Sequence, residues 1–262
     1  MKHIGFVTSE ADPDLTQDDR LAIPHLNELG LTVTPVIWDR WPQLQIDELD
    51  GLIFRSCWNY HRKYPEFLQF LKQLESSAIP AWNPVSVIKW NLNKNHILEF
   101  ESKVLTPKTK WLPSGTAFSP LQLEMLAKQW ACPQWVIKPA VSLNGCETYL
   151  IEIADIQEAA DVIADLLDGR DVLIQEFIPE ILNAGEISLV YFNNNFSHAS
   201  HKLPADNEFR VHAEYGGSRK PISVSPSVIA YGNAVLEAMN QDLLYARVDL
   251  VESARGPILI EL

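Results

Sequence analysis

Polar and charged residues recur along the last third of this chain, at positions where a buried sheet usually carries apolar side chains. Residues 245–251 and 257–262 read as paired strands, and each has a carboxylate, Asp249 or Glu261, within an apolar run. A buried charge needs an opposite charge, a metal or several hydrogen bonds. The series indicates a sheet that holds a polyphosphate and a divalent metal, and therefore ATP chemistry. In chain order it comprises Gln175-Glu176-Phe177, Gly185-Glu186, Lys202, Arg210, Gly216-Gly217, Asp249 and Glu261.

The two carboxylates suit a metal site. Antiparallel pairing across residues 252–256 places Asp249 and Glu261 on one face of the sheet. Mg²⁺ takes hard oxygen ligands, usually one or two carboxylates together with phosphate oxygens and water. The alternative is that each carboxylate only forms an ion pair, with Arg247 or Arg255, and the two strands alone leave both interpretations open.

Isolated cations extend the pattern. Lys138 ends an apolar run at residues 135–137, so its ammonium needs an anionic partner if that strand is buried. Lys202 and Arg210 flank the end of a predicted hairpin and its following turn, and arginine suits bidentate recognition of phosphate or carboxylate. The backbone amides of Gly216-Gly217 can approach a developing oxyanion. Surface ion pairs and a plain turn are the alternatives.

The composition excludes several classes of function. A net charge of −13 leaves no basic stripe for a nucleic-acid backbone, so we expect no nucleic-acid partner. No apolar run approaches the length of a membrane span or a signal peptide, so we expect no membrane partner and a cytoplasmic protein. P-loop, Rossmann, serine-hydrolase and zincin motifs are absent from the sequence.

The N-terminal third alternates strand and helix patterns, which predicts a small parallel sheet of βαβ type. We expect strands at residues 3–8, 31–38 and 51–55, and helices at 18–29 and 64–77.

The rest of the chain predicts two further parts, and the expected domains are residues 1–92, 93–174 and 175–262. A helix follows at about residues 85–100, and residues 106–119 read as a connection. The later elements are strands at 135–138 and 172–177, a helix at 156–167, a hairpin of 186–192 and 196–203, a helix at 225–239 and the final strand pair.

Taken together, the motifs resemble those of ATP-grasp carboxylate–amine ligases, in the style of the prokaryotic glutathione synthetase-like and D-cycloserine-ligase-like proteins. The resemblance covers nearly the whole chain and is specific from residue 83 onward. The matching segments are residues 83–84, 89–94, 106–109, 136–142, 175–178, 185–189, 198–202, 209–210, 215–217 and 245–249. The resemblance implies an α/β protein of the ATP-grasp fold, with an N-terminal βαβ subdomain, a lid subdomain and a C-terminal antiparallel core.

The resemblance also implies the reaction. A small carboxylate would attack the γ-phosphoryl group of ATP, and an amine would displace phosphate from the acyl phosphate, with Mg²⁺ (or Mn²⁺) as the metal. Catalysis by positioning and charge neutralisation requires no protein nucleophile. The expected partners are small-molecule carboxylate and amine substrates, and a homo-oligomer is compatible with the sequence.

Residue roles follow from the same resemblance. The phosphates of ATP would be held by Lys94 and Lys138, under a lid loop that starts at Ser142. The transferring phosphoryl group would be stabilised by Lys202 and Arg210, with Gly217 supplying backbone amides. The remaining roles are adenine contacts by Gln175, Glu176, Phe177 and Ile178, a ribose contact by Glu186, and metal binding by Asp249 and Glu261.

The sequence departs from the family pattern in two places. The lid loop, residues 142–148, has only Gly145 where many relatives are rich in glycine. The pattern also implies a third metal ligand two residues after Glu261, and the sequence stops at Leu262. The expectation is therefore a truncated chain or, alternatively, a non-catalytic nucleotide-binding protein with a regulatory role.

A substrate site is predicted near the end of the third N-terminal strand, where parallel sheets usually present ligand groups. Arg55 would hold a substrate carboxylate, with Trp58 and Tyr60 as walls. The alternative is that these aromatic residues belong to a core.

Overall fold

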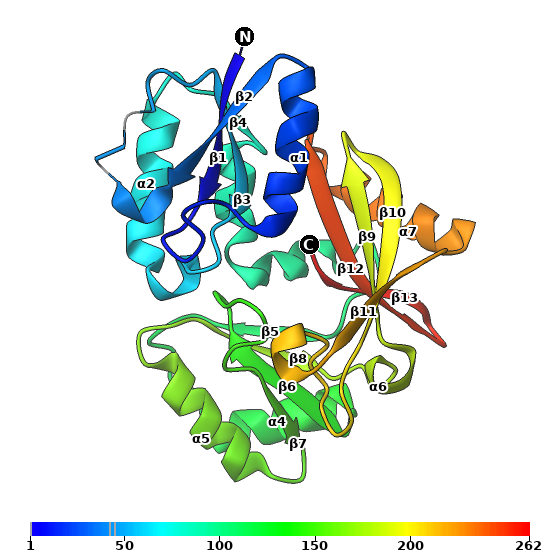
Figure 1. Cartoon of the computed structure of the whole chain (residues 1–262). Coiled ribbons are helices and arrows are strands. Elements are labelled where there is room, and N and C mark those ends of the chain that lie inside the picture. The colour runs from blue at the N-terminus through cyan, green and yellow to red at the C-terminus, as the bar shows by residue number, and fades with distance from the viewer. Residues whose placement is uncertain (1, 42, 45) are drawn as a thin grey trace. The chain divides into compact units, whose positions relative to one another are not determined.

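The computed structural model describes residues 2–41, 43–44 and 46–262 (Figure 1). The chain forms two compact units, Met1–Trp90 and Asn91–Leu262, and each is considered by itself. Within the described residues, no helix has the length and apolar character needed to cross a membrane.

The first unit is built on a parallel sheet in the order β2-β1-β3-β4. Neighbouring residues of β3 point to opposite faces: Ile53 packs on the cluster that includes Ile23 of α1, whereas Phe54 contacts Phe67 and Phe70 of α2. One helix therefore covers each face (Figure 1). The elements are β1 (Lys2–Thr8), α1 (Gln17–Glu28), β2 (Leu31–Ile37), η1 (Trp38–Arg40), β3 (Gly51–Ser56), η2 (Tyr60–Arg62), α2 (Tyr64–Ser76), β4 (Ala81–Trp82) and α3 (Val85–Asn91).

The second unit begins with an antiparallel sheet in the order β5-β8-β6-β7, which we call the lid sheet. Its buried side chains, among them Trp135 and Ile137, pack with Leu123 and Ile163 from two covering helices. The elements of this part are η3 (Lys94–Phe100), β5 (Thr109–Leu112), α4 (Pro120–Trp130), β6 (Gln134–Pro139), β7 (Tyr149–Glu152), α5 (Ile156–Leu167) and β8 (Val172–Glu176).

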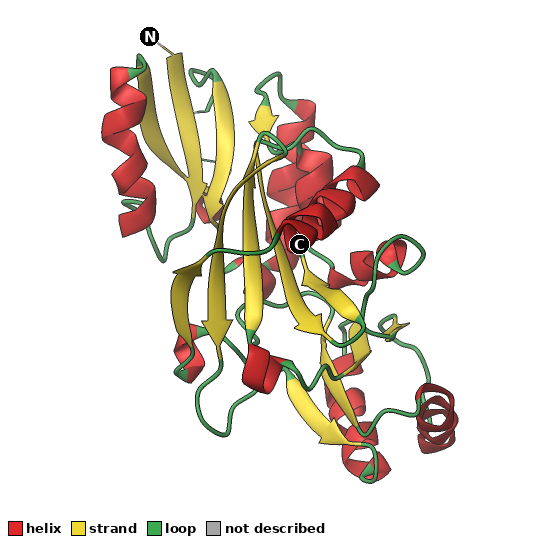
Figure 2. Cartoon of the chain, turned by 90° about the vertical axis from the view of Figure 1, so that its right-hand side faces the viewer, coloured by secondary structure: helices red, strands yellow, loops and turns green. Residues whose placement is uncertain are grey.

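A second antiparallel sheet, in the order β11-β10-β9-β12-β13, completes this unit and is called the core sheet (Figure 2). Helix α7 packs closely against this sheet at Gly232. A Cβ atom there would come within 2.2 Å of the Tyr191 hydroxyl on β9. The elements are α6 (Ile181–Ala184), β9 (Glu186–Phe192), β10 (Asn195–Leu203), η4 (Ala213–Tyr215), β11 (Ser218–Ile222), α7 (Pro226–Met239), β12 (Tyr245–Ser253) and β13 (Gly256–Glu261).

The expected hairpin of β9 and β10 is confirmed. Asn193 and Asn194 have φ values of 49° and 58°, the left-handed region that a tight hairpin turn requires and that asparagine tolerates. The pairing of β12 with β13 is confirmed as well, with Asp249 opposite Glu261.

Two element predictions are wrong. The helix expected at residues 85–100 is broken, because Asn93 has an extended backbone and its side chain accepts from the Asn95 amide to start η3. The connection expected at residues 106–119 contains β5, which pairs with β8. Helix α4 and strands β7 and β11 were not anticipated, and the three-way domain division stays a prediction.

Two leucines of α4 provide a test of the lid core. Leu123 is fully buried, whereas Leu121, two residues earlier on the same helix, is 65% exposed. We expect Leu123→Ala to lower the free energy of unfolding by about 2–5 kcal/mol, because it leaves a cavity against Trp135 and Ile163. Leu121→Ala is the matched control and should change it by less than about 0.5 kcal/mol. Urea denaturation measures both, and equal effects would contradict the packing described.

Candidate active site

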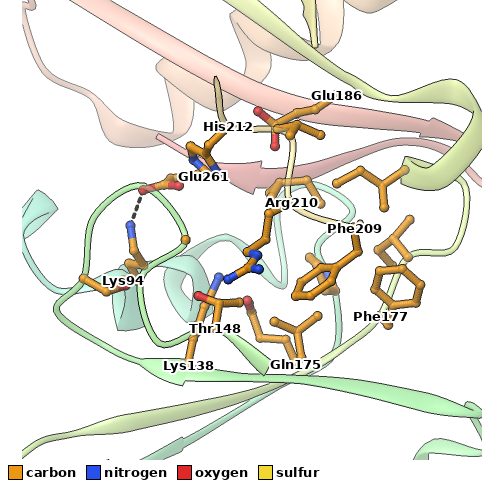
Figure 3. Close-up of a pocket in the computed structure, with 18 of the residues that line it drawn as sticks. Lys94, Lys138, Thr148, Gln175, Phe177, Glu186, Phe209, Arg210, His212 and Glu261 are labelled. Carbon is orange, nitrogen blue, oxygen red and sulfur yellow. Dashed lines mark hydrogen bonds and ion pairs between the residues drawn. The ribbon is translucent and has the colours of Figure 1, made fainter. Parts of the chain in front are cut away.

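The second unit contains a pocket between the lid sheet and the core sheet (Figure 3). It is lined from β6, β8, β9 and β13, and from the loops that follow β6 and β10. The predicted site residues that line it are Lys94, Lys138, Ser142, Gln175, Glu176, Phe177, Ile178, Glu186, Arg210 and Glu261. Lys202, Gly217 and Asp249 are not among its lining residues.

Lys138 reaches the pocket because of strand alternation. Its neighbour Ile137 is buried in the lid core, so Lys138 points to the other face of β6. Across the described residues, no carboxylate lies within ion-pair distance of its ammonium. Burial lowers the pKa of Lys138 to about 8, and the positive charge of Lys94 adds to this effect. Its ammonium and the Arg210 guanidinium point toward one another in the pocket (Figure 3), so this part of the pocket is suited to an anion.

The other end of the pocket is apolar. Phe177 and Phe209 meet edge to face, with ring centroids 6.2 Å apart. Val136, Ile178 and Ile260 extend the same surface. A flat aromatic ligand fits such a lining, with the backbone of the segment after β8 beside it.

Lys94 joins the lid sheet to the core sheet. Its backbone amide donates to the Ala140 carbonyl at 2.8 Å, and its ammonium forms an ion pair with Glu261 (Figure 3). Burial alone raises the pKa of Glu261, but the positive charges of Lys94 and Lys138 outweigh it and hold that pKa well below its usual range. Glu261 is therefore ionised and available as a charged ligand.

Asp249 is the most heavily bonded carboxylate of the site, and its side chain is 2% exposed. It accepts from the Ser188 hydroxyl at 2.6 Å, from the Lys202 ammonium at 3.1 Å, and from two nitrogens of Arg247 at 2.7–3.0 Å. Burial raises the pKa of Asp249, but Arg247 and Lys202 outweigh this effect, and the net pKa is lowered. Asp249 is therefore charged despite its burial.

Lys202 also reaches Glu186, whose carboxylate accepts from the ammonium at 2.7 Å. Burial raises the pKa of Glu186 to about 7, and the negative charge of Asp249 acts in the same direction. Glu186 is thus the one carboxylate of this cluster whose protonation changes near neutral pH.

The ion pairs considered as an alternative for the two carboxylates are present in part. Asp249 pairs with Arg247, whereas Glu261 pairs with Lys94, and Arg255 lies 3.5 Å from Glu176. These pairs do not exclude a metal, because Asp249 and Glu261 remain directly opposite one another on β12 and β13.

The donor set fits Mg²⁺. Two ionised carboxylates supply hard oxygen ligands from one face of the sheet, and phosphate oxygens and water usually complete such a shell. In the part of the chain that the structure describes, no group of three His, Cys, Asp or Glu side chains forms a metal cage.

Gly217 has a packing reason to be glycine. Its N–H donates to the His212 carbonyl at 3.1 Å, and a Cβ atom there would lie 2.3 Å from the Val211 carbonyl oxygen. The amide is therefore engaged in the turn, and its role toward an oxyanion stays a prediction.

The predicted substrate residues lie in the first unit. Arg55 donates to the buried carboxylate of Asp19 at 2.7 Å. The ring centroids of Tyr60 and Phe67 are 5.6 Å apart, which agrees with the alternative that Tyr60 belongs to a core. Trp58, by contrast, is 46% exposed. Their contact with a substrate stays a prediction.

Phe209, His212 and Glu208 were not assigned a role from the sequence. Phe209 and His212 line the pocket, and Glu208 binds Arg210. Arg247, which the sequence offered only as an ion-pair partner, holds Asp249. The Arg247 interaction had a signal, since residues two apart on a strand share a face. The other three depend on the path of an irregular loop.

Comparison with known proteins identifies the family. Residues 108–262 match the RimK-like ATP-grasp domain, and residues 4–83 match the N-terminal domain of the D-cycloserine synthetase DcsG. The chain belongs to the RimK-like ATP-grasp family. The resemblance inferred from the sequence is confirmed.

Individual relatives agree with this assignment. The cycloserine biosynthesis protein DcsG of Streptomyces lavendulae is 25% identical over 99% of this chain and 89% of its own length. A probable alpha-L-glutamate ligase of Shewanella amazonensis is 27% identical over 73% of this chain, which spans 61% of that relative. The crystal structure of DcsG superposes with a TM-score of 0.87 at 22% identity, over 99% of this chain and 90% of that one.

This RimK-like ATP-grasp protein is therefore an ATP-dependent ligase that forms a C–N bond between a carboxylate and an amine. The predicted α/β ATP-grasp fold is confirmed by the similarity to solved structures of this fold.

The pKa of Lys138 leads to a stability prediction. Without nucleotide, we expect Lys138→Met to raise the free energy of unfolding at pH 7, because the variant no longer buries an ammonium. Between pH 8 and 10.5 the folded wild-type protein releases a proton that the unfolded chain keeps, so its unfolding free energy rises with pH and the advantage of the variant shrinks. The full difference is at most about 3 kcal/mol.

Urea denaturation from pH 7 to 10.5 measures this difference. Lys128→Met, on the exposed side of α4, is the matched control and should follow the wild type. A stability difference that does not vary with pH would contradict the lowered pKa.

Proposed function

We propose that the pocket of the second unit binds ATP and Mg²⁺ and activates the carboxylate of an amino-acid-type substrate, to which an amine is then joined. The observation that carries this proposal is the pair of cations, Lys138 and Arg210, which face one another in a pocket that Glu261 also lines. Asp249 lies opposite Glu261 on the neighbouring strand. Cations and carboxylates in this order match the demands of a metal-bound triphosphate.

The base and the phosphates of the nucleotide are assigned to different ends of the pocket. Adenine would be held at the apolar end by Phe177, Ile178 and Phe209, and Gln175 and Glu176 line the same side. Glu186 would hold the ribose. Lys94 and Lys138 would hold the triphosphate, with Ser142 at the start of the loop that would cover it.

Charge neutralisation comes from residues already held in place. Arg210 lines the pocket and is fixed by Glu208, so it would act on the phosphoryl group with little reorganisation. Lys202 is fixed by Glu186, which lines the pocket, and by Asp249, and it would act from beside the pocket. Mg²⁺, when bound, would be held by Asp249 and Glu261 and would neutralise charge on the phosphate oxygens. Lys94, which pairs with Glu261 in this structure, would then contact phosphate instead.

The substrate class comes from the relatives. One relative is named for cycloserine biosynthesis and another as a glutamate ligase, and both names refer to amino-acid chemistry. We therefore infer an acid or amine of amino-acid size, with Arg55 as the candidate for a carboxylate in the first unit.

Binding is tested by calorimetry with a non-hydrolysable ATP analogue, with and without Mg²⁺. We expect Mg²⁺ to strengthen binding, because two ionised carboxylates otherwise face the phosphates. Lys138→Met should weaken binding at least about 10-fold, and the exposed Lys128→Met should leave it unchanged. Binding that is unaffected by Mg²⁺ would favour the non-catalytic alternative, and an absence of binding would refute the site.

Turnover is tested by screening amino acids in pairs for ADP release that requires both an acid and an amine. With ¹⁸O in the carboxylate, the acyl phosphate route transfers one labelled oxygen to the released phosphate. Arg210→Ala should reduce turnover by about two to three orders of magnitude, since it removes a charge aimed at the transferring group. ADP release without transfer of label would exclude the acyl phosphate.

A further inference from the structure

We propose that Glu208 and Tyr215 are positioning residues for the reaction, because they hold the Arg210 guanidinium toward Lys138 at the phosphate end of the pocket. This inference rests on the proposed function, in which Arg210 contacts the transferring phosphoryl group. The three residues lie on the loop between β10 and β11, and with Gly145 of the lid loop they form what we call the arginine socket.

Glu208 holds one edge of the guanidinium. Its carboxylate accepts from Arg210 Nε at 3.0 Å and from Nη2 at 2.7 Å, a bidentate arrangement. The same carboxylate accepts from the backbone amides of Phe209 and Arg210 at 2.9 and 3.0 Å, so it is itself fixed by the main chain. The hydrogen bonds from Arg210 lower the pKa of Glu208 to about 2, so the pair stays ionised throughout the working range of pH.

Tyr215 covers one face of the guanidinium, which lies 3.4 Å from the centroid of its ring. The Tyr215 hydroxyl donates to the Gly145 carbonyl at 3.3 Å, which joins the socket to the lid loop. Gly145 has a φ of +66°, and a Cβ atom there would lie 3.0 Å from Arg210 Cδ. The side chain is therefore confined at its edge, its face and its stem.

Confinement matters because an unrestrained arginine side chain samples many rotamers. Lys138 and Arg210 point toward the same space, where the proposed function places the transferring phosphoryl group. Glu208 holds one edge of the guanidinium, so the donors of the other edge would stay directed at that group. Such a fixed donor costs no reorganisation during the reaction.

The role of Glu208 is tested by Glu208→Gln, which keeps the shape of the side chain and removes its charge. We expect kcat to fall about 10- to 100-fold while KM for ATP changes by less than about 3-fold, because a misplaced group impairs the reacting geometry more than binding. The control is Glu75→Gln, which breaks the exposed Glu75–Lys89 ion pair of the first unit and should leave both constants unchanged.

A double-mutant cycle separates positioning from a general structural effect. In the Arg210→Ala background, Glu208→Gln should cause no further loss of the residual turnover, because the residue that it positions is gone. Additive losses would overturn the proposal. If Arg210→Ala itself keeps full activity, the proposed function fails in its use of Arg210; if Arg210→Ala is inactive and Glu208→Gln is fully active, only the positioning role fails.

Tyr215 offers an independent test that does not depend on a charge change. Tyr215→Phe keeps the ring over the guanidinium and should retain kcat within about 3-fold, whereas Tyr215→Leu removes the cation–π contact and should lower kcat about 10-fold. Wild-type activity in both variants would refute the stacking role. An equal loss of kcat in both variants would also refute it, and would assign the effect to the Tyr215 hydroxyl and its bond to the lid loop.

Discussion

The burial of Asp249 within the core sheet is the constraint on which the rest of the site depends. In the strand pairing, Asp249 lies opposite Ser188 on one side and Glu261 on the other, so a row of polar groups crosses three adjacent strands. Removal of a carboxylate from water costs several kcal/mol unless cations and hydrogen bonds compensate. Here the compensation comes from Lys202 on β10 and Arg247 on β12.

The lid sheet supplies the opposite charge to the same pocket. Strand alternation buries Ile137 in the lid core and presents Lys138, and the break between α3 and η3 brings Lys94 beside Glu261. Anions of the core sheet and cations of the lid sheet and its connections therefore face one pocket from two separate hydrophobic cores. Each hydrophobic core therefore fixes its own side of the site.

Sequence patterns were sufficient where the signal is local. The βαβ rhythm, the asparagine turn at residues 193–194 and the carboxylates within apolar strands all follow from short-range periodicity, and all are present. Helix α4 was missed although it has a local signal: Ser119 and Gln122 form a capping box, with Pro120 between them. By contrast, β11 is almost wholly exposed, and only its pairing with β10 defines it as a strand.

Partners across an irregular loop were beyond prediction for a different reason. Arg210 could be singled out as a cation, but the contacts that orient it come from Glu208 and Tyr215 on the same irregular loop and from Gly145, which is 65 residues away in the chain. Nothing in the periodicity of the sequence relates these positions. The residues that carry charge are therefore readable from the sequence, whereas those that orient the charge depend on the tertiary path.

The net charge of the chain is negative, whereas cations gather at the phosphate end of the pocket, which explains how an acidic protein can bind a polyanion. The protein carries a net charge of −13, yet the phosphate end of the pocket presents Lys94, Lys138 and Arg210. Exposed charges are screened beyond about 8 Å at physiological ionic strength, whereas charges inside a pocket interact strongly at short range. Binding is thus decided by a few cations held in the pocket, and each must be kept from collapsing onto the nearby carboxylates. The separate anchoring of Lys138 by its strand and of Arg210 by its loop meets that requirement. Lys94, which is paired with Glu261, is the cation that the proposed function would have exchange its carboxylate for phosphate.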